Sequence, residues 1–358
     1  MLLFLSKKYE DCGFFKKAKF KKCLKYNQQI MKSRSLGNSG FNVSEVGLGC
    51  WQLGGDWGEG ISEENAFSIM RKAVEQGVTF FDTADVYGAG QSERVIGKFI
   101  KRFKPNLKIA TKFGRDGSVF PDKYTEKALR KSVDDSLNRL GVDTIDLLQL
   151  HCIPSDVLYE GSIFNWLRSL KKEGKIKAFG ASVETVQEGL FCIEQEGITS
   201  LQIIFNIFRQ KPLEELLPKA KAKNVGIIVR LPLASGLLTG KFTTETTFLD
   251  SDHRNYNKNG DAFNVGETFA GLPFEKGVEL SNKIKDNFLK NELTMAQFSQ
   301  RWILDHNAIS CIIPGASSAS QINSNCSVSD LKPLSSSIHE TLKTFYKNEI
   351  NQHIRGPY

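Results

Sequence analysis

Short apolar runs alternate with longer amphipathic stretches from Ser33 onward. This alternation is typical of βα units, in which buried parallel strands are covered by helices. Eight apolar runs predict eight strands, at residues 46–50, 78–81, 108–112, 145–151, 178–182, 201–205, 226–231 and 309–314. The stretches between them are long enough for right-handed crossovers, and several begin with capping signals, such as Ser62 before Glu63 and Glu64. The pattern therefore predicts an α/β fold, a (β/α)8 TIM barrel.

Two segments fall outside the eightfold pattern. Residues 35–43 carry turn residues between short extended stretches, which predicts an N-terminal β-hairpin that caps the closed end of the barrel. Residues 233–274 form a long polar insertion after the seventh strand, rich in Gly, Thr, Asp and Asn and interspersed with Phe. The insertion is too long for an ordinary connection, so we expect a functional lid loop.

The basic charge of the chain is concentrated at its start. The 358 residues carry a formal charge of +8, and residues 1–34 alone contain ten Lys or Arg against two acidic residues. The remainder is therefore neutral, so the basic charge says nothing about the barrel, for which we expect no nucleic-acid partner. Residues 1–30 could be a targeting segment or a nucleic-acid arm, but we expect a disordered or non-native leader before a catalytic domain at 31–358.

Cysteine usage and hydropathy indicate the cell compartment. The 7 cysteines are odd in number and show no paired short spacing, so the sequence predicts neither a disulfide framework nor a metal site. No apolar run approaches the length of about 18 residues that a spanning helix needs, so we expect no membrane partner. A cytoplasmic protein acting on a small molecule fits best.

Four polar residues follow the apolar runs at places where a barrel carries its chemistry. Asp82 follows the second run, Tyr87 lies five residues later, Lys112 ends the third run and His151 ends the fourth. Catalytic groups of such barrels lie at the carboxyl ends of the strands. We therefore expect these four side chains to meet at one rim.

This set of groups suits the reduction of a carbonyl, in which negative charge builds on oxygen and a proton must be delivered there. A phenol with a pKa of about 10 is a poor acid at neutral pH unless a cation stabilises its phenolate, and Lys112 would supply that cation for Tyr87. Asp82 would hold the ammonium, and His151 could orient the carbonyl oxygen. Each residue alone also has a purely structural explanation, and only their joint occurrence favours catalysis.

Several motifs in the correct order resemble the aldo-keto reductase family, in its bacterial form. They are FDTADVYG at 81–88 followed by Ser92 and Glu93, LLQLH at 147–151, GAS at 180–182, Gln202 before Phe205 and Asn206, PLASGLLTGK at 232–241 and IPGA at 313–316. The resemblance extends from about Met31 to Asn325. Within this family, the sequence is also similar to the branch that contains the potassium-channel β subunits.

The resemblance implies a catalytic tetrad of Asp82, Tyr87, Lys112 and His151, with Trp51, Tyr87 and His151 facing substrate. It implies NADP as cofactor, bound without a Rossmann domain, and a monomer or weak homo-oligomer. The implied cofactor-binding residues are Trp51, Asp82, Ser182, Gln202, Arg230, Pro232, Leu233, Ser235, Gly236, Leu237, Lys241, Arg254, Gly315, Ser317, Gln321 and Asn325.

The sequence departs from the family pattern at the cofactor. Arg230 stands where many members stack a Tyr on nicotinamide, and Val183 replaces a frequent Asn. The segment 316–321 brings serines but no charge to the expected 2′-phosphate, so Arg254 or Lys241 would have to supply it. NAD therefore stays as the alternative cofactor.

Two other functions are compatible with these residues. A regulatory or redox-sensing subunit would bind cofactor with little turnover. A barrel aldolase or isomerase would use Lys112 as a Schiff base. Trp51, Gln52, Trp57 and the Phe-rich lid could wall an apolar or sugar-stacking pocket, or could be ordinary packing at the rim.

Overall fold

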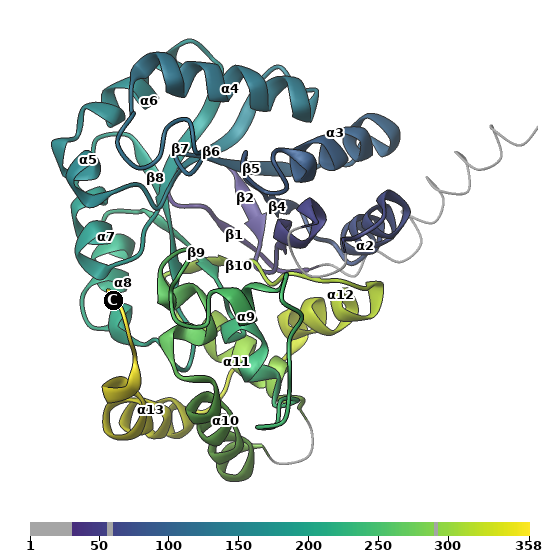
Figure 1. The fold of residues 1–358 in the computed structure, drawn as a ribbon, viewed down its shortest axis with the longest axis vertical. Coiled ribbons are helices and arrows are strands. Elements are labelled where there is room, and N and C mark those ends of the chain that lie inside the picture. The colour runs from purple at the N-terminus through teal and green to yellow at the C-terminus, as the bar shows by residue number, and fades with distance from the viewer. Residues whose placement is uncertain (1–30, 56–59, 290–292) are drawn as a thin grey trace, which may run out of the picture.

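The computed structural model describes residues 31–55, 60–289 and 293–358. The leader at 1–30 and Trp57 lie outside these ranges. Within them, eight parallel strands form one sheet in which each strand pairs with the next along the chain (Figure 1). The strands are β3 (Leu48–Gly49), β4 (Phe80–Asp82), β5 (Lys108–Phe113), β6 (Ile145–His151), β7 (Ile176–Ser182), β8 (Ile198–Ile204), β9 (Gly226–Arg230) and β10 (Ile309–Ile312).

The first and last strands meet and close the sheet into a barrel. Val46 bridges Ile312 and Gly49 bridges Gly315, both in parallel orientation. The amide of Gly47 donates to the carbonyl of Ile312 at 2.8 Å. The predicted (β/α)8 barrel is confirmed, although the predicted first strand at 46–50 is regular only over Leu48–Gly49.

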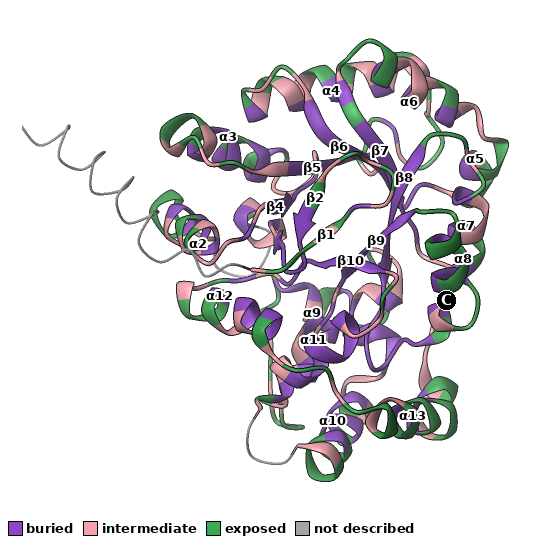
Figure 2. Cartoon of the chain, turned by 180° about the vertical axis from the view of Figure 1, so that it is seen from behind, coloured by how far each residue is buried: buried purple, intermediate pink, exposed green. Residues whose placement is uncertain are grey.

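The helices cover the outside of the barrel, with buried residues toward the strands and exposed residues outward (Figure 2). The α-helices of the described residues are α2 (Glu63–Glu75), α3 (Gln91–Phe103), α4 (Glu126–Leu140), α5 (Ser155–Glu160), α6 (Ser162–Lys172), α7 (Val186–Cys192), α8 (Leu216–Ala222), α9 (His253–Tyr256), α10 (Phe274–Phe288), α11 (Met295–Leu304), α12 (Ala319–Cys326) and α13 (Ser336–Phe345), of which α9 belongs to the insertion after β9. Ser62 caps α2 as predicted, because its side chain accepts from the amide of Asn65. In the described part of the chain, none of these helices has the length and apolarity needed to cross a membrane.

The inward-facing side chains change from apolar to polar along β4 and β5. Inward positions recur every second residue, so Phe80 precedes Asp82 and Ala110 precedes Lys112 on the same face. The apolar inward-facing residues form a separate cluster with residues of the N-terminal hairpin. Its members are Leu36, Val43, Phe80, Ala110, Leu147, Ala178, Ile228, Cys311 and Ile313. Leu36 and Val43 come from the predicted hairpin, β1 (Ser33–Ser35) and β2 (Asn42–Ser44), which closes this end. The polar layer is thereby directed to the opposite, open end.

The insertion after β9 folds into short helical turns: η3 (Ala234–Thr239), α9, η4 (Val265–Glu267) and η5 (Phe269–Gly271). Arg355, near the end of the chain, fastens this insertion with its guanidinium, which donates to the carbonyl of Gly271 at 3.0 Å and to that of Lys258 at 2.8 Å. The insertion therefore has a defined structure that is held by distant residues.

Candidate active site

Lys112 lies at the centre of the polar layer, with its side chain only 1% exposed. Its ammonium donates to Oδ1 of Asp82 at 2.5 Å and to the carbonyl oxygen of Thr83 at 2.8 Å. Burial alone would lower the pKa of Lys112, but the neighbouring Asp82 carboxylate raises it above the usual value. The amine is therefore held as an ammonium ion.

Asp82 is fixed by two glutamine side chains as well as by Lys112. Its second oxygen, Oδ2, accepts from Gln149 at 2.9 Å and from Gln202 at 2.8 Å. Gln149 faces the barrel interior because it lies two residues before His151 on β6. The carboxylate thus has charged and neutral donors around it, as a buried ion requires.

Tyr87 reaches this network from the loop after β4. Nζ of Lys112 donates to its hydroxyl oxygen at 3.2 Å, and this ammonium also lies 4.9 Å from the centre of its ring. The loop is packed tightly, since a Cβ at Gly88, where φ is +58°, would lie 2.0 Å from the carbonyl oxygen of Gly54. Burial raises the pKa of Tyr87 to about 12, although the nearby Lys112 lowers it. The phenol is protonated at neutral pH.

His151 ends β6 beside Tyr87, with the two ring centres 5.8 Å apart and the planes nearly perpendicular. Burial holds the pKa of His151 well below its usual value, and the cations Lys112, Arg115 and Arg230 lower it further. The imidazole is therefore neutral. Its Nδ1 atom is buried and has no hydrogen-bond partner within the described residues. A neutral imidazole with an unpaired nitrogen suits a hydrogen bond to a ligand.

Tyr87 and His151 line a cavity of about 310 Å³ at the rim of the barrel, whereas Asp82 and Lys112 are not among its lining residues. Its walls are formed by Trp51, Val86, Tyr87, Arg115, Phe120, His151, Cys152, Ser182, Gln202, Arg230, Ala262, Phe263 and Glu267. Trp51 stacks on Tyr87 with the ring centres 5.9 Å apart, and Phe263 of the insertion packs against Trp51. The insertion after β9 therefore contributes to the wall of the cavity, as predicted for a lid.

The structure brings only part of the predicted cofactor set to the cavity, namely Trp51, Ser182, Gln202 and Arg230. The amide nitrogen of Gln202 already donates to Asp82 and to Gln149. The hydroxyl of Ser182 lies 3.4 Å from the sulfur of Cys152. Contacts of Gln202 and Ser182 with a cofactor, which the family resemblance implies, would therefore compete with these interactions.

Asp82, also predicted to contact the cofactor, instead binds Lys112, Gln149 and Gln202 and does not line the cavity. The remaining predicted cofactor residues form two groups outside the cavity lining. Pro232 comes just before the insertion, and the residues of this group within it are Leu233, Ser235, Gly236, Leu237, Lys241 and Arg254. Gly315, Ser317, Gln321 and Asn325 follow β10 or lie on α12. Gly236 has a φ of +104° in a tight turn, with Nη1 of Arg254 near by, which fits a phosphate contact. Arg254 is also paired with Asp252, at 2.5 Å.

Arg230 is buried at the end of β9 and has three partners. It is ion-paired with Glu267 and donates to the carbonyl oxygen of Val183 at 3.1 Å and to the sulfur of Cys152 at 3.6 Å. Its Nε atom has no hydrogen-bond partner within the described residues. Arg230 and His151 both line the cavity, and each carries a buried nitrogen without a hydrogen-bond partner among the described residues.

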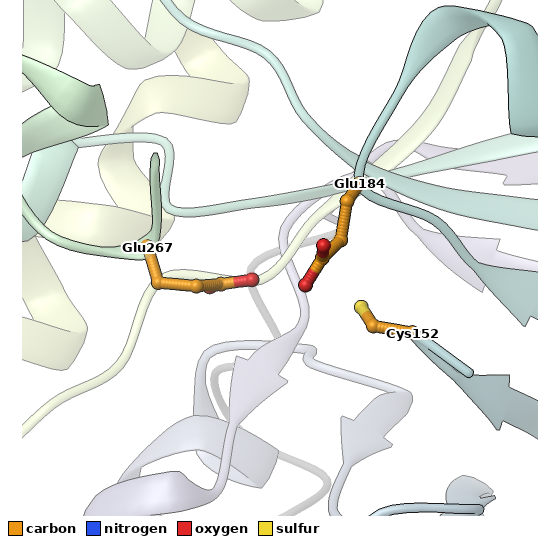
Figure 3. Close-up of side chains that lie close together, drawn as sticks. All are labelled: Cys152, Glu184 and Glu267. Atoms are coloured by element: carbon orange, nitrogen blue, oxygen red, sulfur yellow. The ribbon is translucent and has the colours of Figure 1, made fainter. Parts of the chain in front are cut away.

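Sequence reasoning missed several residues of the cavity wall. Arg115 lies two residues after the end of β5 and Cys152 directly follows β6, at positions where the sequence could have revealed them. Glu267 lies in the insertion, where no periodic pattern singles it out. Cys152, Glu184 and Glu267 place possible metal-ligand atoms within 4.8 Å of one another (Figure 3). The guanidinium groups of Arg115 and Arg230 already supply positive charge to these two carboxylates.

Comparison with known proteins assigns the family. The model of the Aldo/keto reductase family matches residues 45–347. The chain is 31% identical over 326 residues to an uncharacterized oxidoreductase, YqkF, of Bacillus subtilis (strain 168), covering 89% of this chain and 98% of that protein. The structure resembles the holo form of aldo-keto reductase AKR11C1 from Bacillus halodurans, with a TM-score of 0.71, 26% identity and coverage of 88% and 96% of the two chains. It also resembles the glycerol dehydrogenase AKR11B4 from Gluconobacter oxydans, with a TM-score of 0.72, 27% identity and coverage of 91% and 97%. The chain therefore belongs to the aldo/keto reductase family of oxidoreductases.

Proposed function

We propose that this protein is an NADP(H)-dependent oxidoreductase that reduces aldehydes or ketones to alcohols, or runs the reverse reaction, with Tyr87 as general acid and base. The observation that carries the proposal is the 3.2 Å contact between Nζ of Lys112 and the hydroxyl oxygen of Tyr87. A phenol beside a fixed ammonium, at the wall of a cavity, is placed to exchange a proton with a bound carbonyl oxygen.

In reduction, Tyr87 delivers its proton to the substrate oxygen. Lys112 stabilises the phenolate that remains, and Asp82 keeps that ammonium in place through its 2.5 Å hydrogen bond. His151 orients the substrate oxygen as a neutral hydrogen-bonding group. The nicotinamide, when bound, supplies or accepts the hydride.

The cofactor would lie against the side of the cavity formed by Ser182, Gln202 and Arg230, with Trp51 at its edge. Its phosphates would be held by the turn around Gly236 and by the segment at 315–325. Arg254 is the basic side chain next to that turn and supports NADP as first choice, with NAD as the alternative. The proposal includes a single catalytic domain at 31–358, a cytoplasmic location and a monomer or weak homo-oligomer.

The proposal is tested by NADPH oxidation with a panel of aldehydes and ketones. We expect turnover by the wild-type protein and loss of about 10³-fold or more in kcat for Tyr87→Phe. Fluorescence titration with NADPH and NADH would measure cofactor binding separately, and we expect Tyr87→Phe to retain it. Tight binding without turnover of any carbonyl by the wild-type protein would contradict the proposal and favour a regulatory subunit.

A further inference from the structure

Four charged side chains form one compact cluster on the cavity wall, here called the charge quartet: Arg115, Glu184, Arg230 and Glu267. Nη2 of Arg115 donates to Oε1 of Glu184 at 2.7 Å, and Arg230 is ion-paired with Glu267. Carboxylate oxygens of Glu184 and Glu267 lie within 4.8 Å of each other. Figure 3 shows these two side chains side by side. Asn264 donates to the other oxygen of Glu184 at 3.0 Å and so ties the insertion to this cluster.

The members of the charge quartet differ in their access to the cavity. Arg115, Arg230 and Glu267 line it, whereas Glu184 is not among the lining residues. Arg115 also donates from Nε to the carbonyl oxygen of His151 at 3.2 Å and stacks over Phe120 at 4.8 Å. The guanidinium of Arg115 is thus fixed at the cavity, and Glu184 neutralises it from behind.

We propose that Glu184 is a specificity-determining residue that makes the pocket select uncharged carbonyl substrates over anionic ones. The inference rests on the proposed carbonyl reductase function. The two guanidinium groups and the two carboxylates cancel, so the wall carries no net charge toward a substrate. A guanidinium without a carboxylate partner would bind an anionic substrate group through charge-assisted hydrogen bonds. With Glu184 in place, an anionic substrate must compete with a carboxylate that is already bound.

Substitutions that remove a single charge from the Arg115–Glu184 pair can test this inference. Glu184→Gln preserves size and removes one negative charge, and it leaves the residues that line the cavity unchanged. Arg115→Gln removes the positive partner instead. Because the side chains of Arg115 and Glu184 are 21% and 19% exposed, their charges are only partly screened by solvent and should act on a substrate in the cavity.

The experiment compares 4-nitrobenzaldehyde with 4-carboxybenzaldehyde, which share shape but differ by one negative charge. The readout is the ratio of kcat/KM for the anionic to the neutral aldehyde, with NADPH as cofactor. We expect the wild-type protein to prefer the neutral aldehyde. Glu184→Gln should raise the ratio about tenfold, Arg115→Gln should lower it, and the double variant should return it close to the wild-type value.

Glu173→Gln serves as the matched control, because Glu173 pairs with Arg130 on the surface and should leave the ratio unchanged. If Arg115 and Glu184 had a purely structural role, each single variant would change kcat/KM for both aldehydes by the same factor. The ratio would then not move in opposite directions in the two single variants, and that result would overturn the inference. A wild-type preference for the anionic aldehyde would overturn it too. Turnover of neither aldehyde or of any other carbonyl would remove the proposed function as well, whereas turnover of both with an unchanged ratio removes this inference alone.

Discussion

Nζ of Lys112 and Oδ1 of Asp82 lie 2.5 Å apart, in side chains that are 1% and 3% exposed. Such a buried ion pair loses the hydration of both ions, and its geometry must compensate for that loss. Here the carboxylate has two further donors and the ammonium two further acceptors. The pair therefore holds a fixed cation beside Tyr87, and removal of either partner leaves an uncompensated charge.

Lys112→Met should destabilise the fold as well as abolish turnover. The substitution leaves the Asp82 carboxylate buried without a cation, which costs about 3–5 kcal/mol in comparable cases. Urea unfolding would measure the loss. Lys131→Met is the control, because Lys131 pairs with Asp135 on the surface and should cost less than about 1 kcal/mol. A loss as small as that of the control would show that the buried pair is not needed for stability.

The two reaction directions should differ in their dependence on pH. Because burial raises the pKa of Tyr87 to about 12, the phenol is protonated throughout the neutral range, as reduction requires. Oxidation requires the deprotonated form, whose population rises with pH up to the pKa. We expect kcat for reduction to be flat between about pH 6 and 9 with respect to this group, and kcat for alcohol oxidation to increase across the same range. Oxidation that is equally fast at both ends of the range would contradict this assignment.

Lys112 should form no Schiff base. The Asp82 carboxylate raises the pKa of the lysine despite its burial, so the amine is protonated and cannot attack a carbonyl. Incubation with an aldehyde and borohydride, followed by peptide mass spectrometry, should show no adduct on Lys112. Modification at this position, absent when the aldehyde is omitted, would instead favour the aldolase or isomerase alternative.

Asp85→Asn should stabilise the protein at neutral pH. Burial, with a contribution from Glu93, raises the pKa of Asp85 to about 7, and its Oδ1 has no hydrogen-bond partner within the described residues. The folded state therefore binds this proton more tightly than the unfolded state, so stability falls as pH rises from about 4 to about 7 and is level above that.

The increase in stability that Asp85→Asn produces should therefore be larger at pH 8 than at pH 5. Thermal unfolding at the two pH values would measure it. Asp122→Asn, at an exposed position, is the control and should show no such difference. An equal gain for Asp85→Asn at both pH values would show that the carboxyl is not held protonated.

The sequence predicts the barrel and its four central polar residues for a physical reason. Strands buried on both faces produce continuous apolar runs, and the polar residues that end those runs share one rim. Asp82, Lys112 and His151 could be recognised on this basis. Gln149 could have been added, because it shares a face with His151 at a spacing of two.

The part of the cavity wall that comes from the insertion could not be predicted in this way. Glu267 and Phe263 lie in an insertion without periodicity, and their positions depend on contacts with distant residues such as Arg230 and Trp51. Glu184 can be linked to the cavity only through its ion pair with Arg115, which is far from it in sequence. Contacts of this kind arise from the tertiary structure, and no local sequence pattern predicts them.

The seam between β3 and β10 has a consequence for the order of assembly. Val46 and Ile312 belong to opposite ends of the barrel sequence, so the ring cannot close until every intervening strand has been made. Asp82, Lys112 and His151 lie on β4 to β6, in the first half, whereas Arg230 and the turn at Gly236 follow in the second. A folding intermediate with an open sheet can therefore contain the proton-transfer groups before the part of the pocket proposed to hold the cofactor exists.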